Sequence, residues 1–187
     1  MKKVVDQATE VIKQGGVILY PTDTIWGLGC DPLNAAALEK INRIKKRLSG
    51  KSYILLINSE RQLNYHVAEI PDVCYDLIDF ANKPLTIVYP KGKNVDHSVK
   101  AEDGSLGIRM IKQPVYLNAL LTKLKFGIIS TSANTSGSAF PKSFSEIDQS
   151  IRDEVDFIVD PSFENKKIQP SQIIKIGANS EVTIIRK

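Results

Sequence analysis

Segments with helical apolar spacing alternate with short apolar runs along the whole chain, and this alternation limits the possible folds more than any other feature. Apolar residues recur at helical spacing over 4–12 and stop at Gly15, which is typical of a helix C-terminus. A strand over 17–20 follows, then a helix that we expect to begin after Asn34, then a strand over 53–57. Such alternation predicts an α/β protein.

The remaining patterns continue this order and define one sheet. They predict short helices after Ser59 and over 73–80, a helix over 114–121, and strands over 85–89, 106–111, 126–131, 157–159, 172–176 and 182–185. Ser143 and Glu146 have capping-box spacing, which predicts a helix through Ile147 and Ile151. Hairpin-like spacing near the C-terminus favours a mixed sheet. We therefore expect a single α/β domain over 1–187, a twisted mixed sheet flanked by helices.

Composition excludes several other classes of protein. Cys30 and Cys74 are the only cysteines, too few for a disulfide scaffold and without zinc-ligand spacing. The longest apolar runs have the length of strands, and no apolar leader follows the basic start. We expect a soluble cytoplasmic protein with no metal-binding side chains and no membrane partner.

Two nucleotide-binding signatures do not match. The segment 50–52 ends like a P-loop, but position 45 is Lys instead of the first Gly and a strand follows. The segment 27–32 has Pro where a dinucleotide fingerprint needs its third Gly.

His66 and His97 lack partners at metal or triad spacing, so we expect both to be surface or loop residues.

Four segments carry the residues suited to chemistry. The first, over 21–29, follows a predicted strand and combines Thr22, Thr24 and Trp26 with two glycines that would let a ligand approach the backbone. An ordinary turn rich in turn-forming residues is the alternative interpretation.

The second segment is a basic run of six cations within twelve residues and without an acid: Lys40, Arg43, Lys45, Lys46, Arg47 and Lys51. A solvated helix face is the usual meaning of such a run, but solvated faces normally mix both signs of charge. The single sign favours an anionic ligand, either a triphosphate or a nucleic acid.

The third and fourth segments lie on later strands. Arg109 stands in an apolar strand, where a guanidinium needs either a structural partner or a ligand. The run 130–137 is rich in hydroxyls and includes Thr131, Ser132 and Asn134, which offer short donors for phosphate oxygens. An ordinary polar loop is the alternative here.

Six short motifs occur in one order along nearly the whole chain: Pro21-Thr22-Asp23-Thr24 with Gly27-Leu28-Gly29, Lys45-x-Arg47, Pro84-Leu85-Thr86, Gly107-Ile108-Arg109, Ser132-x-Asn134 and Pro170-Ser171-Gln172-Ile173-Ile174. Together they resemble the YrdC family of L-threonylcarbamoyladenylate synthases. The chain is similar to the short, single-domain form, and it lacks the zinc and acylphosphatase modules that accompany YrdC-like modules in hydrogenase-maturation carbamoyltransferases.

The resemblance implies a YrdC-like fold and a nucleotidyltransferase. Its reaction joins L-threonine, bicarbonate and ATP into threonylcarbamoyl-AMP and releases pyrophosphate. The product serves threonylcarbamoyladenosine modification of tRNA through a downstream transferase. Mg²⁺ would accompany ATP, held mostly by substrate oxygens and water, and no tightly bound cofactor is expected.

The resemblance also implies roles for individual residues. Lys45, Arg47, Ser132 and Asn134 are the expected catalytic group, on the phosphates, the carboxylate and the carbamate. Arg109 is expected at the α-phosphate, Ser171 is expected to close the site, and Thr22 and Thr24 are expected at the amino-acid end. Thr131 and Trp26 are expected among the residues that bind the substrate or nucleotide, with Trp26 in the pocket wall.

The sequence departs from the family pattern at several places, among them Leu48 and Ser52, which stand where prolines or glycines are frequent near the Lys45-x-Arg47 pair. Trp26 stands where the family usually has Tyr. Asn82-Lys83 replaces a usual Pro-Gly, and Met110-Ile111-Lys112 replaces a proline and polar residues that commonly follow the strand arginine.

A non-catalytic RNA-binding module, for double-stranded RNA or tRNA, is the alternative function. The basic run and a pI near 9.0 favour it. Aromatic residues make up 7% of the chain and none lies within the basic run, which argues against base stacking on single strands. Weak RNA binding beside catalysis remains compatible with the sequence.

Overall fold

The computed structural model describes residues 1–47, 53–164, 170–177 and 181–187. Its α-helices are α1 (Lys2–Lys13), α2 (Ala35–Ile44), α3 (Glu60–His66), α4 (Val73–Asp79), α5 (Val115–Leu124) and α6 (Gln149–Glu154). Its strands are β1 (Ile18–Pro21), β2 (Trp26–Gly29), β3 (Ile54–Ile57), β4 (Leu85–Tyr89), β5 (Leu106–Met110), β6 (Ile128–Ser132), β7 (Phe157–Ile158), β8 (Gln172–Ile176) and β9 (Val182–Arg186).

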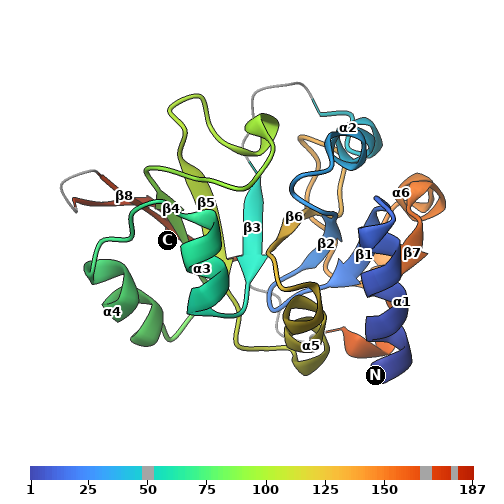
Figure 1. The fold of residues 1–187 in the computed structure, drawn as a ribbon. Helices are drawn as coiled ribbons and strands as arrows, with labels where there is room; N and C mark the ends of the chain where they lie inside the picture. The colour runs from blue at the N-terminus through green and yellow to red at the C-terminus, as the bar shows by residue number, and fades with distance from the viewer. Residues whose placement is uncertain (48–52, 165–169, 178–180) are drawn as a thin grey trace.

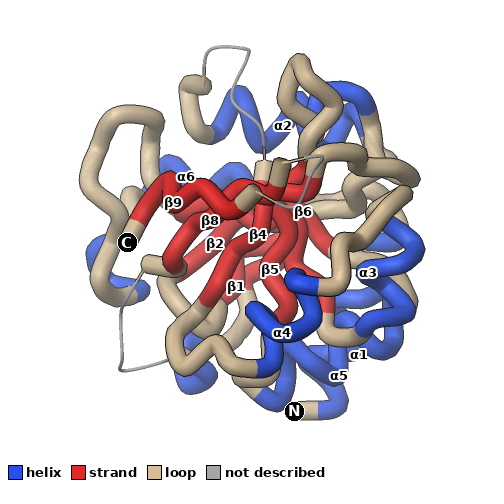
Figure 2. Tube along the Cα trace, turned by 90° about the vertical axis from the view of Figure 1, so that its left-hand side faces the viewer, coloured by secondary structure: helices blue, strands red, loops and turns tan. Residues whose placement is uncertain are grey.

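The strands form one nine-stranded sheet in the order β7-β1-β2-β6-β3-β5-β4-β8-β9. The pairs β3–β5, β4–β8 and β1–β7 are parallel, and the others are antiparallel. Figure 1 shows helices around this sheet, and Figure 2 shows the strands running through the middle of the molecule. The predicted fold class, a twisted mixed sheet flanked by helices, is confirmed.

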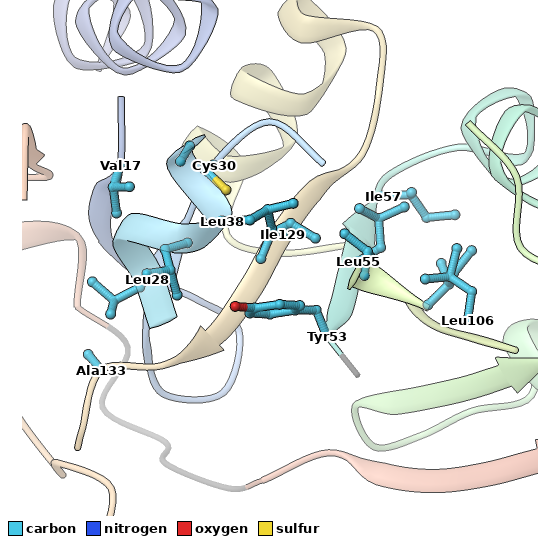
Figure 3. Packing of buried hydrophobic residues seen from close by; sticks show 14 of the residues in the cluster. Val17, Leu28, Cys30, Leu38, Tyr53, Leu55, Ile57, Leu106, Ile129 and Ala133 are labelled. Carbon is cyan, nitrogen blue, oxygen red and sulfur yellow. The ribbon is translucent and has the colours of Figure 1, made fainter. Parts of the chain in front are cut away.

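One face of the sheet packs against α2, α3, α4 and α6. The helices supply Leu38, Leu63, Cys74 and Ile151 to this core, each no more than 1% exposed. Figure 3 shows residues of the same core, among them Leu38 and Leu55, packed over β6 and β3. Burying an aliphatic side chain contributes roughly 1.5–3 kcal/mol, so this core is a major source of stability.

The other face packs against α1 and α5 near β1 (Figure 1). Ala8 and Ile12 of α1 and Leu117 of α5 form a second core with Leu56 and Ile128 of the sheet. Arg109 pairs with Leu56 in the parallel ladder and shares its face. The part of this face that α1 and α5 leave uncovered therefore includes polar side chains such as that of Arg109.

The strand β2 corrects the sequence analysis, which treats Trp26–Gly29 as part of a turn. All four of its residues are buried between β1 and β6. A Cβ atom on Gly29 would lie 2.7 Å from Tyr20 Cε1 and 2.8 Å from the Ile129 carbonyl oxygen. This glycine therefore permits close strand packing, and the ligand approach that the sequence suggested does not apply to it.

The capping-box helix predicted from Ser143 is also wrong. Phe144–Glu146 form a single 3₁₀ turn, and α6 starts later, at Gln149. The Asp148 carboxylate accepts a 2.8 Å hydrogen bond from the Ser150 backbone N–H and caps α6. Asp148, which directly precedes α6, is therefore its N-cap, and Ser143 is not.

His66 contradicts the expectation of a surface or loop histidine, whereas His97 is exposed as expected. His66 ends α3, is 0% exposed, and its Nε2 accepts a 3.0 Å hydrogen bond from the Gly127 backbone N–H. Burial lowers the pKa of His66 to about 4. In the folded protein this imidazole therefore stays neutral down to a lower pH than it does in the unfolded chain.

We predict that His66 makes folding pH-dependent below pH 6.5. Because the folded pKa lies below the unfolded value, the unfolded chain binds more protons between pH 6.5 and 4, and stability falls as pH falls through that range. The loss reaches about 3 kcal/mol in urea unfolding titrations. His66→Gln should flatten this slope, while His97→Gln should retain it, and equal slopes in both variants would contradict the prediction.

Candidate active site

A cavity of about 400 Å³ opens over the Arg109 face of the sheet. Eight of the ten residues predicted for the site line it: Thr22, Thr24, Trp26, Arg109, Thr131, Ser132, Asn134 and Ser171. They come from the β1–β2 turn, from β2, β5 and β6, from the loop after β6, and from the segment before β8. Segments far apart in sequence therefore meet at one concave surface.

The β1–β2 turn is held by the Thr22 hydroxyl. This oxygen accepts from the backbone N–H groups of Thr24 (3.0 Å) and Ile25 (3.1 Å) and donates to the Ile25 carbonyl (2.7 Å). It also lies 2.9 Å from the Thr24 hydroxyl oxygen. Thr22 thus shapes the turn. The segment is both an ordered turn and part of the cavity wall.

Arg109 is both a cavity residue and half of a buried ion pair. Its Nη2 lies 2.9 Å from Asp23 Oδ1, and the two side chains are 6% and 15% exposed. Burial raises the pKa of the Asp23 carboxyl, and the charge of Arg109 opposes that rise. Removal of either partner would leave an uncompensated buried charge, which costs about 3–5 kcal/mol.

Lys45 is not among the residues that line the cavity. Its ammonium donates to the backbone carbonyl of Ser132 and, at 2.6 Å, to that of Asn134. Burial, and secondarily the charge of Arg47, lowers the pKa of Lys45 to about 8. In this structure Lys45 binds the backbone at the end of β6, a contact different from the phosphate contact that the resemblance implies.

Arg47 borders the cavity through an aromatic neighbour. Its guanidinium carbon lies 4.4 Å from the centre of the Tyr53 ring, a cation–π distance, and Tyr53 lines the cavity. Burial lowers the pKa of Arg47. The Tyr53 hydroxyl donates to Asn42 Oδ1 at 2.6 Å, which fixes the ring to α2.

Asn134 organises the loop that follows β6. Its Nδ2 donates to the carbonyls of Ser138 (2.6 Å) and Thr135 (3.1 Å), and its Oδ1 lies 3.4 Å from Lys45 Nζ. The amide therefore shapes the loop that presents Ser138 to the cavity.

Arg186 is the principal cavity residue that the sequence analysis missed. Its Nε and Nη2 donate to the Ser171 carbonyl at 2.9 and 2.8 Å, and the Ser171 hydroxyl lies 2.9 Å from that of Thr86. Burial lowers the pKa of Arg186, and the charge of Arg109 adds to this shift. Two guanidiniums thus influence each other across one cavity.

Trp26 forms one wall and is anchored from behind. Its Nε1 donates to Glu164 Oε1 at 2.5 Å, and the same oxygen accepts from the Phe144 backbone N–H at 2.7 Å. The Phe144 ring centre is 5.1 Å from that of Trp26 and 5.4 Å from the Arg152 guanidinium carbon. The sequence pattern of 143–146 carried no sign of this aromatic support.

The basic run is not the single-signed surface that the sequence suggests. Lys40 lies 2.6 Å from Asp156, and Arg43 lies 3.6 Å from Glu154, so acids distant in sequence neutralise part of it. Lys45 points inward, and Lys51 lies outside the described residues. The observation that favoured RNA binding is therefore much weaker in three dimensions.

Within residues 1–47, 53–164, 170–177 and 181–187, no three His, Cys, Asp or Glu side chains gather as a metal site requires. In the same ranges no helix has the length and apolar character needed to cross a membrane.

Comparison with known proteins places these observations in a family. The model of the Sua5_yciO_yrdC family, described as telomere recombination, matches residues 10–187. A curated Pseudomonas aeruginosa (strain UCBPP-PA14) protein named threonylcarbamoyl-AMP synthase is 33% identical over 153 residues, 81% of this chain and 82% of its own length. The protein of the same name from Marinobacter nauticus is 32% identical over 171 residues, 90% of this chain and 89% of the relative.

Two solved structures share the fold. The crystal structure of E. coli YciO has a TM-score of 0.84 and 26% identity, covering 100% of this chain and 90% of that protein. P. abyssi Sua5 complexed with L-threonine has a TM-score of 0.81 and 27% identity, covering 91% of this chain and 50% of that protein. The chain belongs to the Sua5/YciO/YrdC family.

Proposed function

We propose that this chain is a threonylcarbamoyl-AMP synthase, a nucleotidyltransferase that acts through a single YrdC-like domain over 1–187. It joins L-threonine, bicarbonate and ATP and releases pyrophosphate. The observation that carries the proposal is the convergence of eight predicted residues on one cavity, in a chain whose curated relatives bear this name. P. abyssi Sua5, a structural relative, was solved with L-threonine.

The proposed reaction requires this cavity to bind several anions at the same time. Threonine's neutral amine and bicarbonate first form a carbamate with loss of one water. A carbamate oxygen then attacks the α-phosphorus of ATP as the bond to pyrophosphate breaks. Positive charge and fixed donors lower the barrier of such a transfer by positioning and by stabilising developing charge. Arg109 and Arg186 supply guanidiniums, and Thr131 and Ser132 supply hydroxyls, from the cavity walls.

The proposed roles combine the family pattern with this geometry. Arg109, Arg186 and Ser171 hold the phosphates, whereas Thr24 and Trp26 in the wall near Thr22 receive the amino acid. Lys45 is a positioning residue because its ammonium holds the carbonyls of the segment that presents Ser132. Arg47, beside Tyr53, reaches the reacting anions from the rim, and Asn134 keeps the loop in place.

Mg²⁺ would reach this site with ATP. Asp23, the acid on the β1–β2 turn, is engaged by Arg109, and the described residues show no cluster of metal-ligating side chains. Phosphate oxygens and water would therefore supply most ligands. We place the product in the cytoplasm, passed to a transferase that modifies tRNA, with any direct tRNA contact secondary to catalysis.

Pyrophosphate release tests the proposed function directly. We expect turnover of ATP only when both L-threonine and bicarbonate are present, with threonylcarbamoyl-AMP formed in equal amount. Salt-sensitive retention of tRNA without pyrophosphate release would favour the RNA-binding module instead.

Arg47→Ala should reduce kcat/KM because it removes a charged donor from the anions. We expect a loss of about 2–3 kcal/mol in transition-state stabilisation. Arg43→Ala is the matched control, since Arg43 pairs with Glu154 on the surface, and it should keep full activity. Full activity in Arg47→Ala would remove Arg47 from the site.

Arg186→Ala tests the residue that the sequence analysis missed. We expect kcat/KM for ATP to fall about tenfold, or about 1.4 kcal/mol, and the unfolding midpoint to fall as well, because the Ser171 carbonyl loses both of its hydrogen bonds from Arg186. Lys187→Ala should behave like the unmodified protein in the same assay. An Arg186→Ala enzyme with unchanged KM and kcat would show that this guanidinium faces no substrate.

A further inference from the structure

A second cavity, of about 330 Å³, lies where the parallel strands β3 and β5 end and β4 begins. Its walls are largely apolar and include Ile78 of α4 together with Leu85, Ile87, Tyr89, Ile108 and Met110 of the sheet. The carboxyl ends of parallel strands are a common place for ligand sites in α/β proteins. None of the steps proposed for the synthase uses this cavity.

The size of the cavity suits a small organic molecule. An apolar cavity of about 150 Å³ is enough to hold one benzene molecule. The present cavity, at about 330 Å³, can therefore hold a hydrocarbon body of roughly twice that size. Ligand sites of this kind combine an apolar interior with a few polar groups that fix orientation.

The polar groups favour an anion at the mouth. Lys83 and Lys112 both line the cavity and are exposed, and neither belongs to an ion pair in the described part of the chain. The one acid in the lining, Asp23, is already engaged by Arg109. The lining therefore has two cations without acidic partners and one carboxylate whose charge Arg109 neutralises. This excess of positive charge favours an anionic ligand over an amine.

We propose that this cavity binds a small amphiphilic carboxylate, with its hydrocarbon body between α4 and the sheet and its carboxylate between Lys83 and Lys112. Burial of the body supplies most of the affinity, because apolar transfer is worth roughly 25 cal/mol per Å². The two lysines select the sign of the head group. The proposal does not depend on the reaction proposed for the first cavity.

Octanoate, octylamine and octanol are the probes, titrated into the full chain and followed by calorimetry and by backbone amide NMR shifts. We expect saturable octanoate binding with Kd of about 1 mM or tighter, and shifts confined to the segments that line the cavity, namely 78–89 and 108–113 together with Asp23, Ile57 and Leu63. Octylamine should bind at least tenfold more weakly. No saturable octanoate binding, or octylamine binding as tight as octanoate, would overturn the proposal.

Two variants separate the head group from the cavity itself. The double charge reversal Lys83→Glu with Lys112→Glu should weaken octanoate at least tenfold and leave octanol unchanged. Lys3→Glu with Lys13→Glu, on exposed positions of α1, is the matched control and should bind octanoate normally. Ala81→Trp, at a partly exposed lining position, should fill the cavity and abolish binding of both probes, and undiminished binding in that variant would place octanoate elsewhere.

Discussion

The face of the sheet that packs against α1 and α5 also carries polar side chains, and the pairing of these side chains with nearby loops determines the arrangement of the site. Buried polar groups are costly unless they are hydrogen-bonded or paired. Asp23 reaches Arg109 from the β1–β2 turn, and Ser171 reaches Thr86 from the segment before β8. Each pairing draws a loop over the sheet, so the pairings that satisfy the face also shape the cavity.

Much of this arrangement could be predicted from the sequence. Regular apolar spacing located α1, α2 and most strands, because burial on one face of an element leaves a clear periodic pattern. Asn34 was predicted as the cap of α2, and its Oδ1 accepts from the Ala37 backbone N–H at 2.9 Å. The motifs also named eight residues that line the cavity, because they lie within or next to strands whose positions the apolar pattern predicts.

The remaining features depend on contacts between distant segments, which no local pattern contains. The buried strand β2 has two glycines in four residues, and its place in the sheet follows from packing against Tyr20 and Ile129. Arg186 lies in an exposed strand whose pairing with β8 brings it to Ser171. The neutralisation of Lys40 by Asp156 joins residues far apart along the chain, and His66 was misjudged because its partner, Gly127, lies on another segment.

The buried ammonium of Lys45 has a chemical consequence for the proposed reaction with bicarbonate. A neutral primary amine adds to carbon dioxide and becomes a carbamate, whereas an ammonium has no lone pair with which to do so. A lysine with its pKa lowered to about 8 would be open to this side reaction in water. Lys45 is 4% exposed and its ammonium donates to two carbonyls, so dissolved carbon dioxide has little access to this nitrogen and the residue is shielded from the modification proposed for threonine's own amine.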